Sequence, residues 1–238
     1  MYEIALQLHM TFQKNKFLDM KKTTLIAALL LISASVFIIS CGKDKPVTSE
    51  SNEVLTTTDG QVYVVDTLNS KAEWKGFKVV KSDNTSHIGN LKFESGEVTV
   101  KENKLESGQF VIDMNSITNE DLKDAEPNGK LLGHLKSADF FDTGKFPTAS
   151  YEITKVTEGP AGSDYNTTLE GNLTLKGITK PFSFNANVKV DKGDLTIATE
   201  PKDINRDEFG IKFQMPAAEG LIKNEISIQA KIKAIEKK

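Results

Sequence analysis

Few side chains in this 238-residue sequence could act as catalytic groups or metal ligands. Of its three histidines, His9 lies near the N-terminus, which leaves His87 and His134 for the body of the chain. The sequence contains neither the Gly-x-Ser-x-Gly motif nor the His-Glu-x-x-His motif, which are typical of serine hydrolases and zinc proteases. We therefore predict that the protein is not an enzyme.

The strongest candidate for acid–base chemistry is His134 with the nearby carboxylates of Asp139 and Asp142. A capped helix end with exposed carboxylates explains the same pattern more simply. A metal site on His87 and His134 would need added carboxylates, and the sequence does not bring any to them. We expect no metal and no cofactor, and we assign both histidines either to contacts with a ligand headgroup or to structural hydrogen bonds.

Arg206 is the only arginine among the 30 lysines and arginines of the chain. Its planar guanidinium can bind a carboxylate or a phosphate through two parallel hydrogen bonds, which lysine cannot do. Two interpretations follow. Arg206 contacts the headgroup of a ligand, or it forms a salt bridge with an acid such as Asp207 or Asp142 and thereby fixes a loop. We favour the salt bridge.

The only cysteine, Cys41, follows a segment that resembles the signal peptide of a bacterial lipoprotein. Lys21 and Lys22 supply a positive start, residues 25–39 are apolar, and the small residue Ser40 precedes the cysteine. The resemblance implies that Cys41 is acylated and anchors the protein to a membrane of the cell envelope, facing the periplasm or the cell surface. A transmembrane helix is the alternative, because residues 23–40 are uncharged.

The sequence divides into three parts. Residues 1–40 are interpreted as a signal peptide, and residues 1–19 as an extension before the true start at Met20. Residues 41–60 contain the acylated cysteine and a polar tether. Residues 61–238 form one folded domain, whose mildly acidic balance, with a net charge of -3 for the whole chain, makes nucleic acid an unsuitable partner.

Alternating polar and apolar residues predict that the domain is built from antiparallel strands. The clearest alternation runs over residues 182–190, with further strands around 169–175 and 226–232. Such strands bury their apolar faces either in a closed barrel or in a sandwich, and the alternation favours neither. A short helix around residues 128–137 is expected to cap the mouth of a barrel. We also expect turns at these positions: 94–96, 101–103, 158–160, 176–177 and 191–193.

Several ordered motifs resemble the YceI-like family. They are residues 74–76, 87–89, 133–142, 145–149, 169–181 and 204–211, and a closing strand from Asn224. The resemblance covers about residues 66–234. It implies a lipocalin-like antiparallel β-barrel of about eight strands with a short capping helix. It also implies that the barrel binds a polyisoprenoid or another long-chain amphiphilic lipid for storage or transport, as a monomer or homodimer.

The resemblance further implies that some apolar side chains line a lipid cavity, whereas each taken alone could simply fill the core. A bulky side chain at Gly171 or Ala186 is then expected to shorten the longest lipid accommodated. The alternative function is a protein-interaction or stress-response module on the same fold without a bound lipid. The candidate cavity residues are Trp74, Phe93, Phe110, Leu131, Leu135, Phe140, Phe141, Phe182, Phe184 and Phe209.

Overall fold

The computed structural model describes residues 59–81 and 83–238 of the chain. These residues belong to the second of the two units into which the chain divides, Val47–Lys238. The predicted signal peptide and the predicted lipidation site at Cys41 lie outside the described residues.

Ten strands, every pair antiparallel, make up one sheet. In chain order they are β1 (Gln61–Val65), β2 (Lys71–Val80), β3 (Asp83–Lys101), β4 (Lys104–Asp113), β5 (Thr148–Glu158), β6 (Thr167–Leu175), β7 (Ile178–Asp191), β8 (Asp194–Thr199), β9 (Lys202–Asn205) and β10 (Leu221–Glu236). The helical segments are α2 (Ala125–Lys136) and three 3-10 turns, η1 (Met114–Ser116), η2 (Arg206–Phe209) and η3 (Ala217–Glu219).

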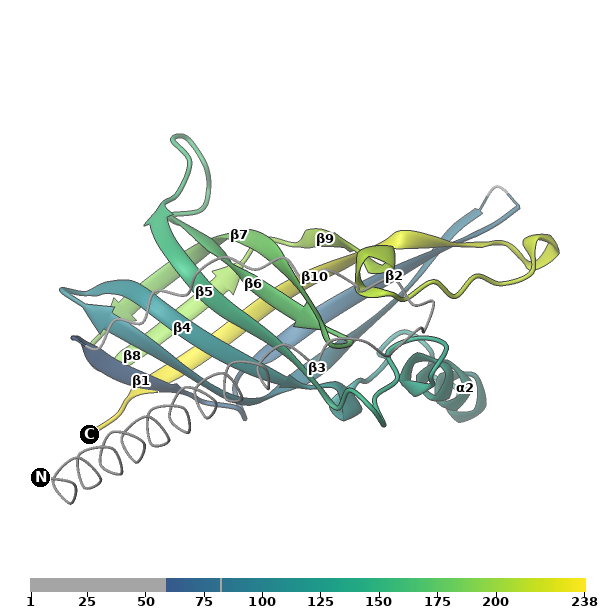
Figure 1. Cartoon of the computed structure of the whole chain (residues 1–238), viewed down its shortest axis with the longest axis horizontal. Coiled ribbons are helices and arrows are strands. Elements are labelled where there is room, and N and C mark those ends of the chain that lie inside the picture. The colour runs from purple at the N-terminus through teal and green to yellow at the C-terminus, as the bar shows by residue number, and fades with distance from the viewer. Residues whose placement is uncertain (1–58, 82) are drawn as a thin grey trace, which may run out of the picture. The chain divides into compact units, whose positions relative to one another are not determined.

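The sheet closes into a barrel because β10 pairs both with β2 and with β8. The closed ring runs β10-β2-β3-β4-β5-β6-β7-β8 and back to β10, which makes eight strands (Figure 1). Strand β1 pairs with β10 and β3, the same two strands that flank β2. Strand β9 pairs with β10 beside the stretch of β10 that pairs with β8. The predicted antiparallel barrel is confirmed, and a sandwich is excluded by the closed pairing.

The alternation seen in the sequence corresponds to the two faces of the barrel wall. In β8, the buried side chains of Leu195 and Ile197 alternate with the exposed side chains of Thr196 and Ala198. Because successive side chains of a strand point to opposite faces, one face of each strand fills the interior while the other meets water.

Tight two-residue turns join several neighbouring strands. Lys176 and Gly177, with φ of 50° and 73°, connect β6 to β7, and Lys192 and Gly193, with φ of 50° and 87°, connect β7 to β8. Positive φ at both central residues gives a turn whose twist matches that of the strands it joins, and glycine adopts it without strain. These turns lie where the sequence predicted them.

One predicted turn was wrong. Residues 94–96 lie inside the long strand β3, where the pairing with β4 shifts between Phe93 and Ser95. The extra residue forms a β-bulge, which bends the strand without ending it. A Glu-Ser-Gly sequence suits both structures, so local turn chemistry could not distinguish them.

Helix α2 is the only α-helix in the described part of the chain. It begins at Ala125, earlier than the predicted start at Asn128, because proline is tolerated in the first turn of a helix. The side chain of Asn128 donates to the backbone carbonyls of Asn119 and Leu122, which fixes the preceding loop against the helix. Leu135 is the buried residue of α2, and the helix lies at the same end of the barrel as the β2–β3 hairpin (Figure 1).

Candidate functional site

One end of the barrel interior is filled by closely packed side chains. Val98, Val100, Ile153 and Leu195 are each exposed by 1% or less. Tyr63 of β1 closes the same region with an exposure of 2%. Dense packing of this kind leaves no room for a ligand, so any ligand must enter the other part of the barrel.

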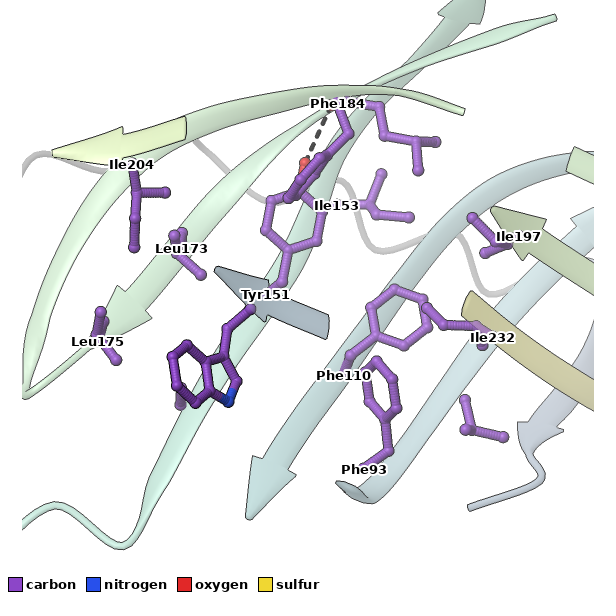
Figure 2. Packing of buried hydrophobic residues seen from close by; sticks show 14 of the residues in the cluster. Phe93, Phe110, Tyr151, Ile153, Leu173, Leu175, Phe184, Ile197, Ile204 and Ile232 are labelled. Atoms are coloured by element: carbon purple, nitrogen blue, oxygen red, sulfur yellow. Dashed lines mark hydrogen bonds between the residues drawn. The ribbon is translucent and has the colours of Figure 1, made fainter. Parts of the chain in front are cut away.

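An inner pocket of about 70 Å³ lies next to this packed region. Phe93, Phe110, Tyr151 and Phe184 supply its aromatic lining, and Figure 2 shows them as two pairs, Phe93 beside Phe110 and Tyr151 beside Phe184. The remaining lining residues are Ala72, Ile112, Leu169, Leu173, Ile197, Thr199, Ile228, Gln229, Ala230 and Ile232.

A middle pocket of about 120 Å³ follows and shares Ala72, Ile112, Leu173 and Ile228 with the inner pocket. Its lining is almost entirely apolar. The other lining residues are Glu73, Trp74, Gly76, Leu91, Met114, Ile117, Leu135, Phe140, Phe141, Ala149, Leu175, Ile204 and Ile226.

The widest of the three, the mouth pocket, measures about 320 Å³ and shares Trp74, Gly76, Leu135 and Phe140 with the middle pocket. It lies between β2, α2 and the loop that leads into β10. Its further lining residues are Phe77, Lys78, His87, Leu131, His134, Phe213, Met215, Pro216, Glu219 and Ile222. The shared side chains place the three pockets in a row, from a partly polar mouth to an apolar end inside the barrel.

Eight of the ten predicted cavity residues line this row of pockets, and Phe182 and Phe209 line none of the three. Phe209 is 2% exposed and packs within the core at η2. Phe182 is half-buried, and Lys202 Nζ lies 5.4 Å from its ring centroid. Strand β7 pairs with β8 only through Ala186–Asp191, so Phe182 stands before the paired stretch.

Tyr151 is the principal cavity residue that the sequence analysis missed. Its hydroxyl is buried and donates toward the carbonyl oxygens of Leu169, at 3.0 Å, and Phe182, at 3.1 Å. Burial raises the pKa of the hydroxyl far above its ordinary value of 10.0, with a smaller contribution from Glu170. Its alternation with Ala149 and Ile153 was visible in the sequence and could have placed it on the inner face.

The effect of a bulky residue at Gly171 on the ligand stays a prediction, and the structure shows that Tyr151 occupies the space such a side chain would need. A Cβ atom on Gly171 would lie 2.5 Å from Cζ of Tyr151 and 2.5 Å from the backbone oxygen of Glu152. Ala186 is fully buried and lines none of the three pockets. Both positions therefore govern packing between strands.

His87 lines the mouth pocket, and its ring is hydrogen-bonded to the carboxylate of Asp121. Nδ1 of His87 lies 2.7 Å from Oδ2 of Asp121, whose Oδ1 accepts from the amide of Ile88 and from the side chain of Asn119. Burial works against the charged form of the Asp121 carboxyl, but the hydrogen bonds from Ile88, His87 and Asn119 outweigh it and lower its pKa.

His134 lies on α2 with its ring between two phenylalanines. The ring centroid is 4.3 Å from that of Phe213 and 5.6 Å from that of Phe140, both in edge-to-face geometry. Nε2 is buried and has no hydrogen-bond partner among the described residues. The structure therefore does not pair this nitrogen with Asp139 or Asp142, as an acid–base cluster would require.

Arg206 is fully buried and lines none of the three pockets. Its guanidinium donates to the backbone carbonyls of Ile211, Ile222 and Lys223 and to the side-chain oxygen of Asn224. The predicted salt-bridge partner was wrong: Asp207 accepts from Asn224 instead.

The guanidinium of Arg206 thus joins η2 to the first residues of β10. Burial lowers the pKa of the guanidinium, and the nearby Asp207 acts in the opposite direction. With its N–H groups directed at backbone carbonyls and Asn224, Arg206 has a structural role at this position.

No group of three or more histidine, cysteine, aspartate or glutamate side chains is arranged to hold a metal ion within residues 59–81 and 83–238. No helix in the same part of the chain is both long enough and apolar enough to span a bilayer.

Comparison with known proteins identifies relatives of the domain. A model of the YceI-like domain matches residues 63–234. A UPF0312 protein of Vibrio parahaemolyticus is 30% identical over 130 residues, which cover 52% of this chain and 61% of the relative. The match therefore spans about six tenths of that relative's length.

Two solved structures share the fold. BcnA of Burkholderia cenocepacia superposes with a TM-score of 0.56 at 23% identity, over 71% of this chain and 98% of BcnA. A polyisoprenoid-binding domain from Saccharophagus degradans, implicated in plant cell wall breakdown, gives a TM-score of 0.51 at 14% identity, over 74% of this chain and 99% of that domain.

Proposed function

The chain belongs to the YceI-like domain family, and on that premise we propose that its barrel binds a polyisoprenoid or another long-chain amphiphilic lipid for storage or transport. The observation that carries the proposal is the row of three pockets, which share side chains from the mouth to the interior. An apolar chain placed in that row leaves water along its length, worth about 0.8 kcal/mol per methylene before the cost of immobilising the chain.

The shape of the row favours a single extended chain. The inner and middle pockets, at about 70 Å³ and 120 Å³, are narrow and apolar, while the mouth pocket is wider and carries the polar side chains. This order matches an amphiphile whose tail enters first and whose head stays at the mouth. The packed end at Val98 and Leu195 limits how deep the tail can reach.

The small volumes also support the alternative function. Pockets that hold drug-sized ligands measure about 300–1,000 Å³, and the two interior pockets are well below that range. A barrel with a filled interior that serves as a protein-interaction or stress-response module would have such volumes. A long isoprenoid requires the side chains between the inner and middle pockets to move apart.

The deciding experiment is extraction of the purified protein with organic solvent, followed by mass spectrometry of the extract. We expect a long-chain lipid in stoichiometric amount. In Ala72→Leu, the larger side chain fills the junction of the two interior pockets and should shorten the longest chain recovered. Ala198→Leu, on the exposed outer face of β8, is the matched control.

If the wild-type protein yields no lipid and binds no long-chain isoprenoid, the filled-core alternative holds. If Ala72→Leu changes stability but not the longest lipid recovered, the lipid does not pass the junction of the two interior pockets.

The absence of a catalytic role is part of the proposal. It is supported by the sequence, which contains neither the serine-hydrolase nor the zinc-protease motif. A screen of the purified protein for esterase and phosphatase activity tests this point, and turnover that is lost in His134→Phe would contradict it.

We further propose that the protein is exported and anchored to the cell envelope through an acylated Cys41. The support is the lipobox-like segment before Cys41 and the polar stretch that separates it from the barrel. Cys41→Ser should release the protein from the membrane fraction or leave it uncleaved. A cleaved Cys41→Ser protein that still fractionates with membranes would contradict the anchor. Separately, a protein whose translation starts at Met20 should be exported like the full 238-residue protein.

A further inference from the structure

We propose that His134 is the headgroup-binding residue of the mouth pocket, and that it selects amphiphiles with an uncharged hydrogen-bonding head such as a hydroxyl, carbonyl or amide. The proposal rests on the lipid-binding function and specifies the class of lipid. The juxtaposition behind it is one buried, unpartnered ring nitrogen on a residue that lines the partly polar mouth pocket and directly precedes Leu135, which lines both the mouth and the middle pocket.

The first argument for this role is that Nε2 of His134 has no hydrogen-bond partner among the described residues. An imidazole nitrogen accepts or donates a hydrogen bond according to its protonation, and a buried polar atom without a partner is costly, which makes such atoms rare in folded proteins. Among the described residues, His134 Nε2 is the only buried side-chain nitrogen or oxygen in this state. A ligand atom that pairs with it removes the cost.

The position of the ring is the second step. Phe213 and Phe140 pack edge-to-face on the imidazole at 4.3 Å and 5.6 Å, so its place in the pocket is set by two neighbours. Phe140 also lines the middle pocket, together with Leu135 from the next position of α2. A head paired with His134 therefore has its tail directed into the tunnel.

The mouth pocket offers few cationic side chains, which is why we expect an uncharged head. A diphosphate needs several cationic donors, best supplied as a guanidinium fork. Arg206 lies beyond Phe140, with its Cζ 5.8 Å from that ring centroid, and its N–H groups are directed at carbonyls and Asn224. The pocket lining holds a single lysine, Lys78, together with the acidic Glu219.

Two further lysines lie near the mouth but not in its lining. Nζ of Lys75 and Nζ of Lys223 lie 5.2 Å and 5.7 Å from the ring centroid of Phe77. Phe77 lines the mouth pocket, but neither Lys75 nor Lys223 is among the lining residues of that pocket. A dianionic head beside His134 would be repelled by the carboxylate of Glu219, and no guanidinium in the pocket lining would bind it. An uncharged head needs only a hydrogen bond with Nε2 of His134.

The test compares three probes with the same C15 isoprenoid chain: farnesol, the hydrocarbon farnesene and farnesyl diphosphate. Binding to delipidated full-length protein is followed by the fluorescence of Trp74, the only tryptophan of the chain, which lines the mouth pocket. We expect wild type to bind farnesol about tenfold more tightly than farnesene, and farnesyl diphosphate more weakly than farnesol.

His134→Phe keeps an aromatic ring between Phe140 and Phe213 and removes the nitrogen. It should lose the preference for farnesol over farnesene, leave farnesene affinity unchanged and unfold at no lower temperature than wild type. His134→Gln, whose amide can still donate or accept, should retain part of the preference. If His134→Phe does not fold, His134→Leu takes its place.

The possible outcomes separate the inference from the function on which it rests. If wild type binds none of the three probes, the lipid-binding function itself fails. If wild type binds farnesol and farnesene but His134→Phe preserves their ratio, or if farnesyl diphosphate binds most tightly, the headgroup role of His134 is overturned while lipid binding stands.

Discussion

The ring of Tyr151 fills the space that a side chain at Gly171 would need. The two residues lie on the neighbouring strands β5 and β6, and a Cβ atom on Gly171 would approach Cζ of Tyr151 to 2.5 Å. The tyrosine hydroxyl then reaches the carbonyl of Leu169 (Figure 2). This glycine is thus a packing partner of the aromatic ring at the inner pocket.

Gly171→Ala should destabilise the protein by about 1–3 kcal/mol, because both the ring and the backbone oxygen of Glu152 must move to admit one methyl group. Urea denaturation measures the change. The control is Gly133→Ala in α2, where a Cβ atom meets nothing within 4 Å, and which should stabilise the helix by up to about 1 kcal/mol. Equal effects of the two substitutions would contradict the packing role of Gly171.

Arg206→Met should cost about 3 kcal/mol of stability, because it removes the donor to the buried carbonyl of Ile211 and to the partly buried carbonyl of Lys223. Lipid content per folded molecule should stay unchanged, since Arg206 lines none of the three pockets. The control Lys130→Met removes an exposed ion pair with Glu126 and should cost no more than about 0.5 kcal/mol. Loss of lipid without loss of stability would assign Arg206 to the ligand instead.

Asp121→Asn should lower stability at pH 7 by about 1 kcal/mol, because the charged carboxylate accepts from Ile88, His87 and Asn119. The pKa of this carboxyl is lower in the folded protein than its ordinary value of 3.8. Its contribution to stability is therefore complete above that value and is lost as the pH falls through the folded pKa.

The difference in unfolding free energy between wild type and Asp121→Asn should accordingly shrink from pH 5 toward pH 2. Denaturation curves at a series of pH values give this difference directly. Asp139→Asn, at an exposed position after α2, serves as the control and should match wild type throughout. If the difference in unfolding free energy grew on acidification, the pKa of Asp121 would be raised and not lowered in the folded protein.

Trp74 should report on occupancy of the barrel. It is 9% exposed, its Nε1 donates to the carbonyl of Thr118, and it lines both the mouth and middle pockets. Ligand that displaces water from these pockets should shift its emission to shorter wavelength in a saturable titration. Trp74→Phe should abolish the signal. If mass spectrometry detects bound lipid but the emission does not change, the lipid lies outside the mouth and middle pockets.

Periodicity predicted the barrel wall well because side-chain direction depends only on neighbouring positions. Leu195, Ile197, Phe184 and Ala186 lie on the inner face as their alternation requires. The same rule places Phe182 beside Phe184, and their ring centroids are 4.9 Å apart. It could not show that Phe182 lies beyond the β8 pairing, because the end of that pairing at Ala186 is a property of the sheet and not of β7 alone.

Contacts between distant parts of the chain could not be predicted from the sequence. Composition singled out Arg206, but its acceptors include the backbone carbonyls of Ile211 and Lys223, whose positions around the guanidinium no sequence pattern specifies. The Asp121 partner of His87 lies 34 residues away. Likewise, nothing in the local sequence shows which neighbouring side chain fills the space at Gly171.

The pairing of β10 determines when the barrel can close during folding. This 16-residue strand is the last strand of the described chain and pairs with β1, β2, β8 and β9. Until it pairs, β2 and β8 present unpaired edges, which are sites of aggregation. Ring closure joins residues far apart in sequence, a topology that folds slowly, so the folding chain depends on protection of these edges until β10 is in place.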